Sequence, residues 1–300
     1  MTGKSGFVGQ NLSKHLESKG FDLTFVGRKK EENQICWSEI ENDNLKSDVF
    51  IHLAGKAHDL KKVSSPQEYY EVNLGLTKKI FNSFLNSEAK LFIFLSSVKA
   101  VADEVFGELT EECEPNPQTH YGKSKLMAEE YIMKNPPSDG KRVIILRPCM
   151  IHGPFNKGNL NLLFNLVSKK IPWPLGAYEN KRSFCNIENL NFAICELIVQ
   201  KTISSGIYNL ADDDAISTNE IINLIGEING SRSQIWKIDP TLISFFSRIG
   251  DFFRLPLNSE SLKKLTENYI VSNRKLKFAI GKPFPITAHA GLIQTLKSFN

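Results

Sequence analysis

Three side chains near the middle of the chain, Ser97, Tyr121 and Lys125, have types and spacing suited to proton transfer. Tyr121 and Lys125 stand four residues apart, so a helix through them places the lysine ammonium beside the phenol. A nearby cation favours the phenolate and moves the pKa of a tyrosine toward the working range of an acid–base catalyst. Ser97 ends a strand-like apolar run, where its hydroxyl can bond the same substrate oxygen. The set predicts proton transfer on a carbonyl/alcohol couple.

An accidental Tyr-x-x-x-Lys spacing is the alternative interpretation, because the chain has seven tyrosines and 37 lysines and arginines. A second motif, in the run Thr2-Gly3-Lys4-Ser5-Gly6-Phe7-Val8-Gly9, favours the chemical interpretation. Its three glycines are spaced three apart and precede a helical pattern at 7–18. Glycines permit a tight turn and close backbone approach to a pyrophosphate, which the helix N-terminus attracts. The start of the chain therefore predicts a dinucleotide-binding turn.

Strand and helix patterns alternate along the first half of the chain, which predicts an α/β fold. Near-continuous apolar strands separated by helices are typical of a doubly wound, Rossmann-type parallel sheet covered on both faces. Beyond residue 154 we expect a smaller, mostly helical substrate lobe that interleaves with the last strands of the sheet. The expected strands lie at 22–27, 48–54, 90–95, 142–147, 182–186 and 206–211. The expected domains are 1–154 with 182–215 for the dinucleotide and 155–181 with 216–300 for the substrate.

One strand is expected but not seen in the sequence. A glycine turn of this kind normally follows a buried strand, and only Met1 precedes Thr2. We therefore expect a truncated first strand, which leaves the facing edges of the strands at 22–27 and 48–54 without a partner.

Composition narrows the class of protein. The net charge of +4 is spread along the chain, so we expect no nucleic-acid surface. No apolar run approaches the ~20 residues of a membrane span, and no signal peptide is visible. The five cysteines include no C-x-x-C pair, which predicts reduced thiols, no disulfide and no metal site. We expect a cytoplasmic protein.

The glycine spacing T-G-x-x-G-x-x-G, with Ser and Tyr-x-x-x-Lys in this order, resembles the extended short-chain dehydrogenases/reductases. Within them the chain is similar, from Thr2 to about residue 295, to the NAD(P)-dependent epimerase/dehydratase family of sugar-nucleotide enzymes. Further matching segments are His52-Leu53-Ala54-Gly55, Asn73, Leu146-Arg147-Pro148, His152-Gly153-Pro154 and Arg182-Ser183-Phe184.

The resemblance implies a role for each matching residue. Tyr121 passes the proton to or from a sugar C4 oxygen, Lys125 tunes Tyr121 and holds the nicotinamide ribose, and Ser97 bonds the C4 oxygen. Arg182 contacts the pyrophosphate of a UDP-sugar, with a surface salt bridge as the alternative. His52 alternates out of an apolar strand, so we expect it to pack there rather than act. The expected cofactor-binding residues are Gly3, Ser5, Gly6, Phe7, Val8, Gly9, Arg28, Leu53, Ala54, Gly55, Asn73, Tyr121 and Lys125, and the expected substrate-binding residues are Ser97, Asn159 and Arg182.

Segments 157–160, 171–176 and 181–184 look like the branch that acts at C4 of UDP-linked hexosamines in bacterial surface-polysaccharide synthesis. Val98 and Lys99 stand where the family's 4,6-dehydratases carry an Asp-Glu pair, which disfavours a dehydratase. Arg28 suits a 2′-phosphate and favours NADP(H) over NAD, unless it only solvates a turn. An NADP preference fits a 4-ketoreductase, which exchanges its cofactor at each turnover. A UDP-glucose or UDP-N-acetylglucosamine 4-epimerase, a non-catalytic dinucleotide-binding module and a homodimer stay open.

Overall fold

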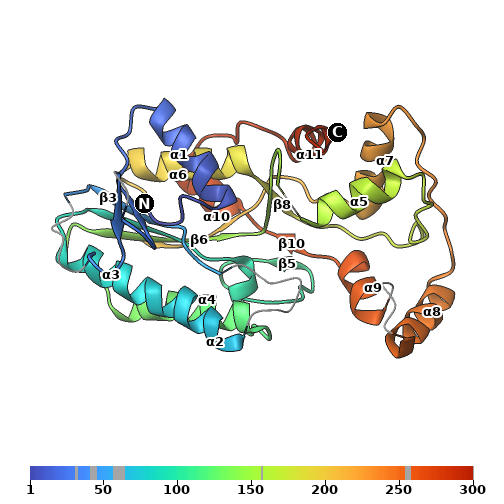
Figure 1. Cartoon of the computed structure of the whole chain (residues 1–300), viewed down its shortest axis with the longest axis horizontal. Coiled ribbons are helices and arrows are strands. Elements are labelled where there is room, and N and C mark those ends of the chain that lie inside the picture. The colour runs from blue at the N-terminus through green and yellow to red at the C-terminus, as the bar shows by residue number, and fades with distance from the viewer. Residues whose placement is uncertain (31–32, 41–45, 57–64, 157, 254–257, 300) are drawn as a thin grey trace.

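The computed structural model of the chain describes residues 1–30, 33–40, 46–56, 65–156, 158–253 and 258–299, apart from the side chains of residues 159, 253 and 260. A parallel sheet lies in one half of the molecule, and a smaller, largely helical lobe forms the other half (Figure 1). The sheet has the order β3-β4-β6-β9, and β1 and β2 form a separate parallel pair. These strands are β1 (Phe25–Gly27), β2 (Gln34–Cys36), β3 (Val49–His52), β4 (Leu91–Leu95), β6 (Arg142–Pro148) and β9 (Gly206–Leu210).

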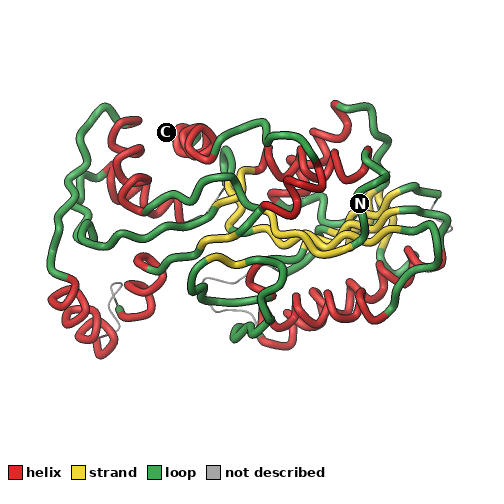
Figure 2. The backbone as a smooth tube through the Cα atoms, turned by 180° about the vertical axis from the view of Figure 1, so that it is seen from behind, coloured by secondary structure: helices red, strands yellow, loops and turns green. Residues whose placement is uncertain are grey.

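Helices cover both faces of the sheet, so the strands lie between two helical layers (Figure 2). Strand β4 is buried along its whole length because both of its faces are covered. Its residues 91, 93 and 95 belong to the core under one layer, and residues 92 and 94 to the core under the other. The first layer contains α1 (Phe7–Ser18), α6 (Ile187–Val199) and α10 (Arg274–Ile280), and the second contains α3 (Leu76–Asn86) and α4 (His120–Lys134).

The doubly wound α/β prediction is confirmed, and each strand expected from the sequence overlaps an observed one. Within the described residues, four additional strands of two or three residues were not predicted, because they are too short to show an apolar pattern. Besides β2 these are β5 (Glu108–Leu109), β7 (Met150–His152) and β10 (Ile270–Val271). Strand β7 pairs with β8 (Phe184–Asn186), and β5 pairs with β10.

The helical lobe has a hydrophobic core of its own, formed by residues of segments 160–175, 216–265 and 288–296 together with Phe184. Its helices are α5 (Asn159–Ser168), α7 (Thr218–Ile228), α8 (Pro240–Phe253), α9 (Ser259–Thr266) and α11 (Ala288–Lys297). Helix α10, which the predicted boundaries assign to the lobe, packs instead against β9 and α6 of the sheet. The exact division into two domains stays a prediction.

The helical run before β4 is interrupted by a change of helix type. Helix α2 (Pro66–Tyr69) leads into the π-helix η1 (Tyr70–Gly75), which continues into α3. Such π-turns occur frequently at functional sites. A short 3₁₀ helix, η2 (Val98–Ala100), follows β4.

Met1 and Thr2 occupy the position between β1 and β3. The amide of Val26 donates to the carbonyl oxygen of Met1 at 2.9 Å, and the amide of Thr2 donates to that of Ile51 at 3.0 Å. The two strand edges expected to lack a partner are therefore bridged by these two residues. A cavity of about 20 Å³ remains beside them, between β1 and β3, and Ile40 and Ile80 contribute to its lining.

Candidate functional site

The glycine turn at the start of α1 packs against the end of β3. Gly3 has φ 79°, and a Cβ there would lie 2.8 Å from the amide nitrogen of Ala54. A Cβ on Gly9 would lie 2.0 Å from the carbonyl oxygen of Gly3, so both positions require glycine. Gly6 caps α1 without a side-chain hydrogen bond, and the first turn carries no acidic residue. This arrangement suits a phosphate group at the helix N-terminus.

The other residues predicted in this turn have different environments. Ser5 and Gly6 are exposed at the surface, whereas Phe7 and Val8 are partly buried and pack against the core of the sheet. Leu53 and Ala54 donate their backbone amides to the hydroxyl oxygen of Thr2, at 3.1 and 3.0 Å. Thr2 thereby ties the turn to the segment after β3, although the sequence analysis assigned it no separate role.

His52 is enclosed in a hydrogen-bond chain and does not reach the surface. Its Nδ1 lies 2.7 Å from the hydroxyl of Thr2, and its Nε2 lies 3.0 Å from that of Thr77. The hydroxyl of Thr77 donates to the carbonyl oxygen of Asn73, so His52 donates from Nε2 and accepts at Nδ1. Burial lowers the pKa of His52 to about 3, assisted by the positive charge of Lys125. This neutral imidazole matches the expected packing role.

Ser97 and Tyr121 are brought together at the carboxyl end of β4. Ser97 is buried and caps η2, where its hydroxyl oxygen accepts from the amide of Lys99 at 3.2 Å. Tyr121 stands in the first turn of α4 and makes a hydrogen bond with the Ser97 side chain. The predicted pair therefore shares one location, as proton transfer to a common substrate oxygen requires.

Two local features hold Tyr121 in place, and the sequence analysis singled out neither. The carboxylate of Asp103 accepts from the amides of Gln118 and Thr119, at 2.7 and 3.2 Å, just before α4 begins. Gly122 lets α4 approach η2 closely, because a Cβ there would lie 2.3 Å from the carbonyl oxygen of Lys99. Lys99 and Asp103 belong to the segment after β4, which the fold brings against the start of α4.

Lys125 lies one helical turn after Tyr121 and is fully enclosed. Its Nζ donates to the carbonyl oxygen of Leu95 at 2.9 Å and lies 4.9 Å from the centre of the Phe94 ring. Burial lowers the pKa of Lys125 to about 8, and the nearby carboxylate of Glu129 opposes this decrease. At neutral pH the side chain is therefore mostly charged.

The direction of the Tyr121 pKa differs from the expectation that Lys125 lowers it. Burial raises the pKa of Tyr121, the hydrogen bond with Ser97 acts against this increase, and the neighbouring Tyr69 adds to it. The desolvation of the phenolate in this protein environment is thus the larger effect.

Asn73 was predicted to bind the cofactor, but its buried amide is engaged by protein groups. Its Oδ1 accepts from the amide of Lys56 at 2.7 Å, and its Nδ2 donates to the Lys56 carbonyl and the Ser124 hydroxyl. It therefore connects the segment after β3 to α4. A Cβ on Gly55 would lie 3.0 Å from both Asn73 Oδ1 and Lys125 Nζ, so the backbone at Gly55 passes directly over the site.

The sequence analysis did not predict the buried ion pair between Arg147 and Glu129. Arg147 at the end of β6 donates from Nε to both oxygens of Glu129, at 3.1 Å, and from Nη2 at 2.6 Å. Ser96 donates to the same carboxylate. Glu129 lies on α4 one turn after Lys125. Because residues four apart on a helix share a face, this spacing could have predicted that Glu129 lies near the site.

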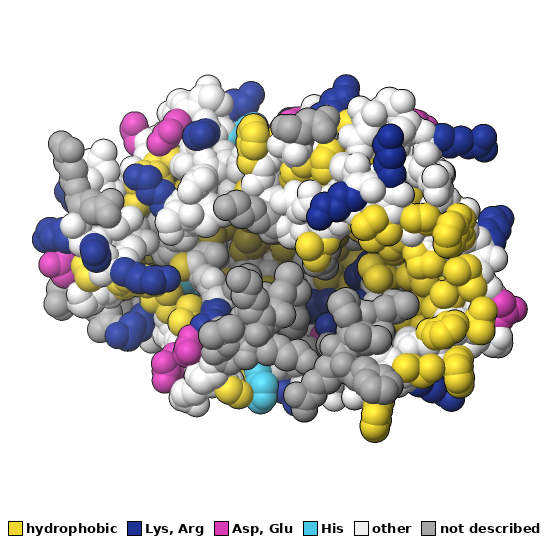
Figure 3. Space-filling model, turned by 45° about the vertical axis from the view of Figure 1, so that its right-hand side comes forward, with side chains coloured by type: hydrophobic (Ala, Val, Ile, Leu, Met, Phe, Trp, Pro, Cys, Tyr) yellow, Lys and Arg dark blue, Asp and Glu magenta, His cyan; other side chains and the backbone are white. Residues whose placement is uncertain are grey.

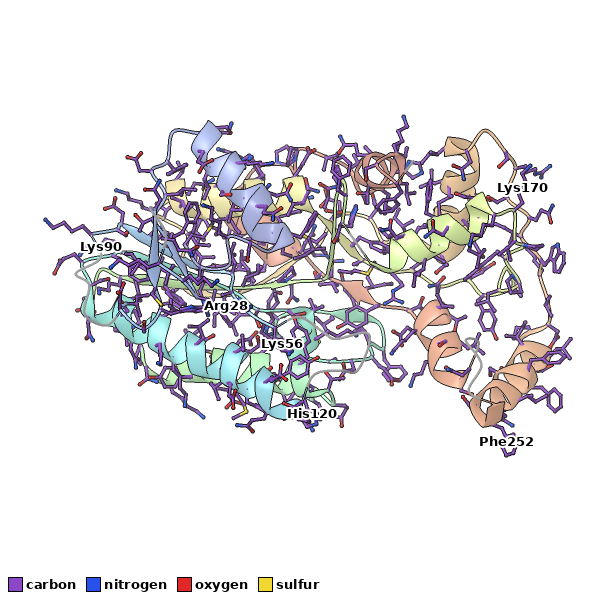
Figure 4. All side chains as sticks on the ribbon, viewed as in Figure 1. Arg28, Lys56, Lys90, His120, Lys170 and Phe252 are labelled. Atoms are coloured by element: carbon purple, nitrogen blue, oxygen red, sulfur yellow. The ribbon has the colours of Figure 1, made fainter. Side chains whose placement is uncertain are left out.

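The remaining predicted residues lie farther from this centre. Arg28 follows β1 and is exposed; in Figure 4 it lies with Lys56 on the side of the sheet toward the helical lobe, opposite Lys90. Arg182 donates from Nη1 to the Lys264 carbonyl, and its Nη2 lies 3.9 Å from a carboxylate oxygen of Glu267. Asn159 begins α5, but its side chain lies outside the described residues.

Lys99 adds a cation that the sequence analysis considered only as a departure from dehydratases. Its Nζ donates to the Asp103 carbonyl at 2.9 Å and lies 4.2 Å from the centre of the Tyr269 ring. Burial lowers the pKa of Lys99, and the positive charges of Arg182 and Lys264 contribute to the decrease. The three positive charges are therefore close enough to act on one another.

Two absences apply to the described residues alone. None of their helices is both long and apolar enough to cross a bilayer. Their His, Cys, Asp and Glu side chains form no group of three that could hold a metal ion.

The chain is similar to a known protein family and to curated relatives. A family model described as the NAD dependent epimerase/dehydratase family matches residues 1–211. The chain is 29% identical over 315 residues to a Vibrio cholerae protein named UDP-glucose 4-epimerase, covering 100% of this chain and 94% of that protein. It is 28% identical over 244 residues to N-acetyl-alpha-D-glucosaminyl-diphospho-ditrans,octacis-undecaprenol 4-epimerase of Escherichia coli O157:H7, covering 74% of this chain and 69% of that protein.

Solved structures support the fold. UDP-N-acetylglucosamine 4-epimerase from Bacillus cereus superposes with a TM-score of 0.75 at 18% identity, covering 99% of this chain and 96% of the other. Thermus thermophilus UDP-glucose 4-epimerase, in complex with NAD, superposes with a TM-score of 0.73 at 20% identity, covering 99% and 97%. At these identities the likeness concerns the fold alone.

Proposed function

Because the chain belongs to the NAD dependent epimerase/dehydratase family, we propose that it oxidises and reduces C4 of a sugar linked through a diphosphate, and so interconverts the two C4 epimers. The observation that carries this proposal is the meeting of Ser97 and Tyr121 at the carboxyl end of β4, with Lys125 one turn further along α4. In open parallel sheets, ligands bind at this edge.

The chain's own residues fit an NAD(P) cofactor. The turn at Gly3 and Gly9 has no room for a Cβ, and α1 presents its N-terminus there, as a dinucleotide phosphate requires. Lys125, which lies directly under the backbone of Gly55, would hold the nicotinamide ribose. Bound NAD(P) would supply the acceptor and donor of the hydride at C4.

Tyr121 transfers the proton, with help from Lys125 and Ser97. Tyr121 takes the proton of the sugar 4-hydroxyl as the 4-keto sugar forms, and it returns a proton when the ketone is reduced. Burial raises the pKa of Tyr121, so its phenolate needs support from a positive charge and a donor. Lys125 supplies the charge, and Ser97 donates to the reacting oxygen and orients it. Reduction from the opposite face of the ring gives the epimer.

The substrate class is supported by the two curated relatives. Both are named as 4-epimerases, one of a UDP-sugar and one of a sugar diphosphate carried by undecaprenol. A diphosphate is common to both carriers. We assign the attraction of this diphosphate to Arg182 and Lys99, because a guanidinium suits a diphosphate and the two positive charges are close enough to act on each other.

A second candidate, the 4-ketoreductase favoured by the sequence, is supported by Arg28. This residue is exposed directly after β1, at the position where an acidic side chain would instead bind a ribose 2′-hydroxyl. Arg28 therefore suits the 2′-phosphate of NADPH, a cofactor that a reductase consumes at each turnover.

Product analysis distinguishes the candidates. The chain is incubated with NAD and UDP-N-acetylglucosamine, UDP-glucose or polyprenyl-diphosphate-linked N-acetylglucosamine, and the C4 configuration of the product is read by NMR. Formation of the C4 epimer from any of the three supports the proposal, and the preferred carrier identifies the substrate class. If no epimer forms but NADPH reduces a 4-keto sugar diphosphate, the ketoreductase replaces it.

A further inference from the structure

Helix α8 is attached to the lobe by one face and exposes an apolar opposite face. Ile243, Ser247 and Gly250 are buried, and the helix packs against α9. Phe245 is 60% exposed and Phe252 83% exposed. The name α8 face is used below for the exposed apolar side chains of this helix, which are Leu242, Phe245, Phe246 and Phe252.

The α8 face belongs to a broad hydrophobic surface of the helical lobe, which Figure 3 shows in yellow with basic side chains around it. In Figure 4, Phe252 extends away from the body of the protein at the end of the lobe. Contiguous apolar patches of this kind mark interaction surfaces in soluble proteins, whereas single exposed apolar residues do not. Phe106 and Phe278 are exposed as much or more, but each stands on a different element.

The charges of the segment indicate which kind of partner fits. Arg232, Lys237 and Arg248 are exposed. Two acidic residues are exposed as well: Asp239 accepts from the amide of Thr241 at 2.8 Å, and Asp251 accepts from the amide of Ser259 at 2.9 Å. The three basic side chains outnumber the two acidic ones, so the surface combines aromatic and aliphatic side chains with a net positive charge, as helices at the interface of an anionic membrane do.

The α8 face is connected to the candidate site through α9. Arg182, which is proposed to attract the substrate diphosphate, donates to the carbonyl oxygen of Lys264 on α9 and lies 3.9 Å from the carboxylate of Glu267 just after it. Helices α8 and α9 pack against each other. A partner bound to α8 would therefore be separated by helix α9 from Arg182 and the expected diphosphate.

We propose that the α8 face docks on an anionic lipid bilayer and holds the site next to a sugar diphosphate carried by a membrane lipid. Docking stands by itself, while the lipid-carried substrate rests on the proposed function.

Vesicle sedimentation tests this docking. The full chain is mixed with phosphatidylcholine vesicles that contain or lack phosphatidylglycerol, and the bound fraction is measured. The Phe245→Ser/Phe246→Ser variant should bind anionic vesicles roughly tenfold more weakly or worse, because two apolar insertions are lost. The matched control is Phe106→Ser/Phe278→Ser, which removes two exposed phenylalanines elsewhere and should bind as the wild type does. Thermal melting and turnover of the soluble UDP-sugar should be unchanged in both variants.

Three outcomes would overturn docking: the wild type fails to bind anionic vesicles, the control loses as much binding as the α8 variant, or the α8 variant changes only the oligomeric mass in solution. The last outcome would assign the face to a second copy of the chain. Vesicle binding by a chain that epimerises no sugar diphosphate would support docking and reject the proposed function. A preference for UDP-sugar over the vesicle-borne substrate would reject the lipid-carried substrate.

Discussion

The ammonium group of Lys125 is bonded to the backbone of the strand that carries the site: Nζ donates to the carbonyl oxygen of Leu95 at 2.9 Å, two residues before Ser97. The bond places the lysine charge inside the protein, beneath the reacting groups. Burial therefore lowers the pKa of Lys125 to about 8, and the charge that supports a Tyr121 phenolate becomes dependent on pH near neutrality.

This dependence predicts the alkaline side of the pH–rate profile. Lys125 is protonated below its pKa and neutral above it, so the support for the phenolate is lost as the pH rises through about 8. We expect kcat/KM for the sugar substrate to fall above that pH, because this parameter reports the free enzyme. A profile that stays level to pH 10 would show that the Lys125 charge is not required.

The buried pair of Glu129 and Arg147 predicts a large loss of stability on breaking it. Glu129→Ala leaves the Arg147 guanidinium buried without its carboxylate, which costs about 3–5 kcal/mol in comparable pairs. The free energy of unfolding from denaturant titration measures the loss. The control is Glu130→Ala, the adjacent exposed glutamate, which should change stability by no more than ~0.5 kcal/mol. Equal effects of the two substitutions would mean that the buried pair contributes nothing particular.

The parts of the site that could be predicted are those set by local spacing. Tyr121 and Lys125 lie on one helix, and the glycine turn directly precedes another, so sequence distance alone relates these residues. Glu129 also lies on α4, but its importance depends on Arg147 from β6, and nothing in the spacing of the two residues predicts that contact. The sequence predicted a lowered pKa for Tyr121, whereas burial raises it. The spacing shows that Lys125 is near but does not show that Tyr121 is buried.

In the fold, too, local patterns could be predicted and contacts between distant segments could not. The long apolar run of β4 predicted a buried strand, whereas β5 and β10 exist only because segments more than a hundred residues apart pair with each other. Likewise, the sequence of α8 does not predict which of its apolar side chains are exposed, because their exposure depends on the contact between α8 and α9.

The close approach of the glycine turn to β3 predicts a position-specific effect of alanine. Gly9→Ala places a Cβ 2.0 Å from the carbonyl oxygen of Gly3, so the turn must move and dinucleotide affinity should fall by tenfold or more, roughly 1.4 kcal/mol. Gly158→Ala is the matched control, because a Cβ there meets no atom within 4 Å. NADH binding measured by fluorescence compares the two. Unchanged affinity in Gly9→Ala would remove the turn from the cofactor site.

In a preparation whose chain begins at Met1, the amino group of this residue predicts how stability varies between pH 5 and 8. Burial lowers its pKa from 8.0 to about 5, and it donates to the carbonyl oxygen of Thr24 at 2.6 Å. In this range the unfolded chain binds more protons than the folded one, so this group makes stability rise with pH. Thermal melts of a preparation whose mass confirms Met1 measure the rise.

An engineered extension provides the control for this effect. Several apolar, β-branched residues placed before Met1 remove the charge from this position and add side chains beside the cavity between β1 and β3. The extended chain should melt at a higher temperature and show a smaller rise in stability from pH 5 to 8. A lower melting temperature with the same pH dependence would contradict this account of the Met1 environment.

The central claim is that Tyr121 transfers the proton at the sugar C4 oxygen. The most direct measurement is the turnover of Tyr121→Phe compared with the wild type on the substrate identified by product analysis, with the affinities for cofactor and substrate measured in parallel. Loss of the transferable proton should lower kcat by roughly 10²–10⁴-fold, because general acid–base catalysis contributes that much. Both affinities should remain close to those of the wild type, since the ring stays in place. Full turnover in Tyr121→Phe would contradict the account.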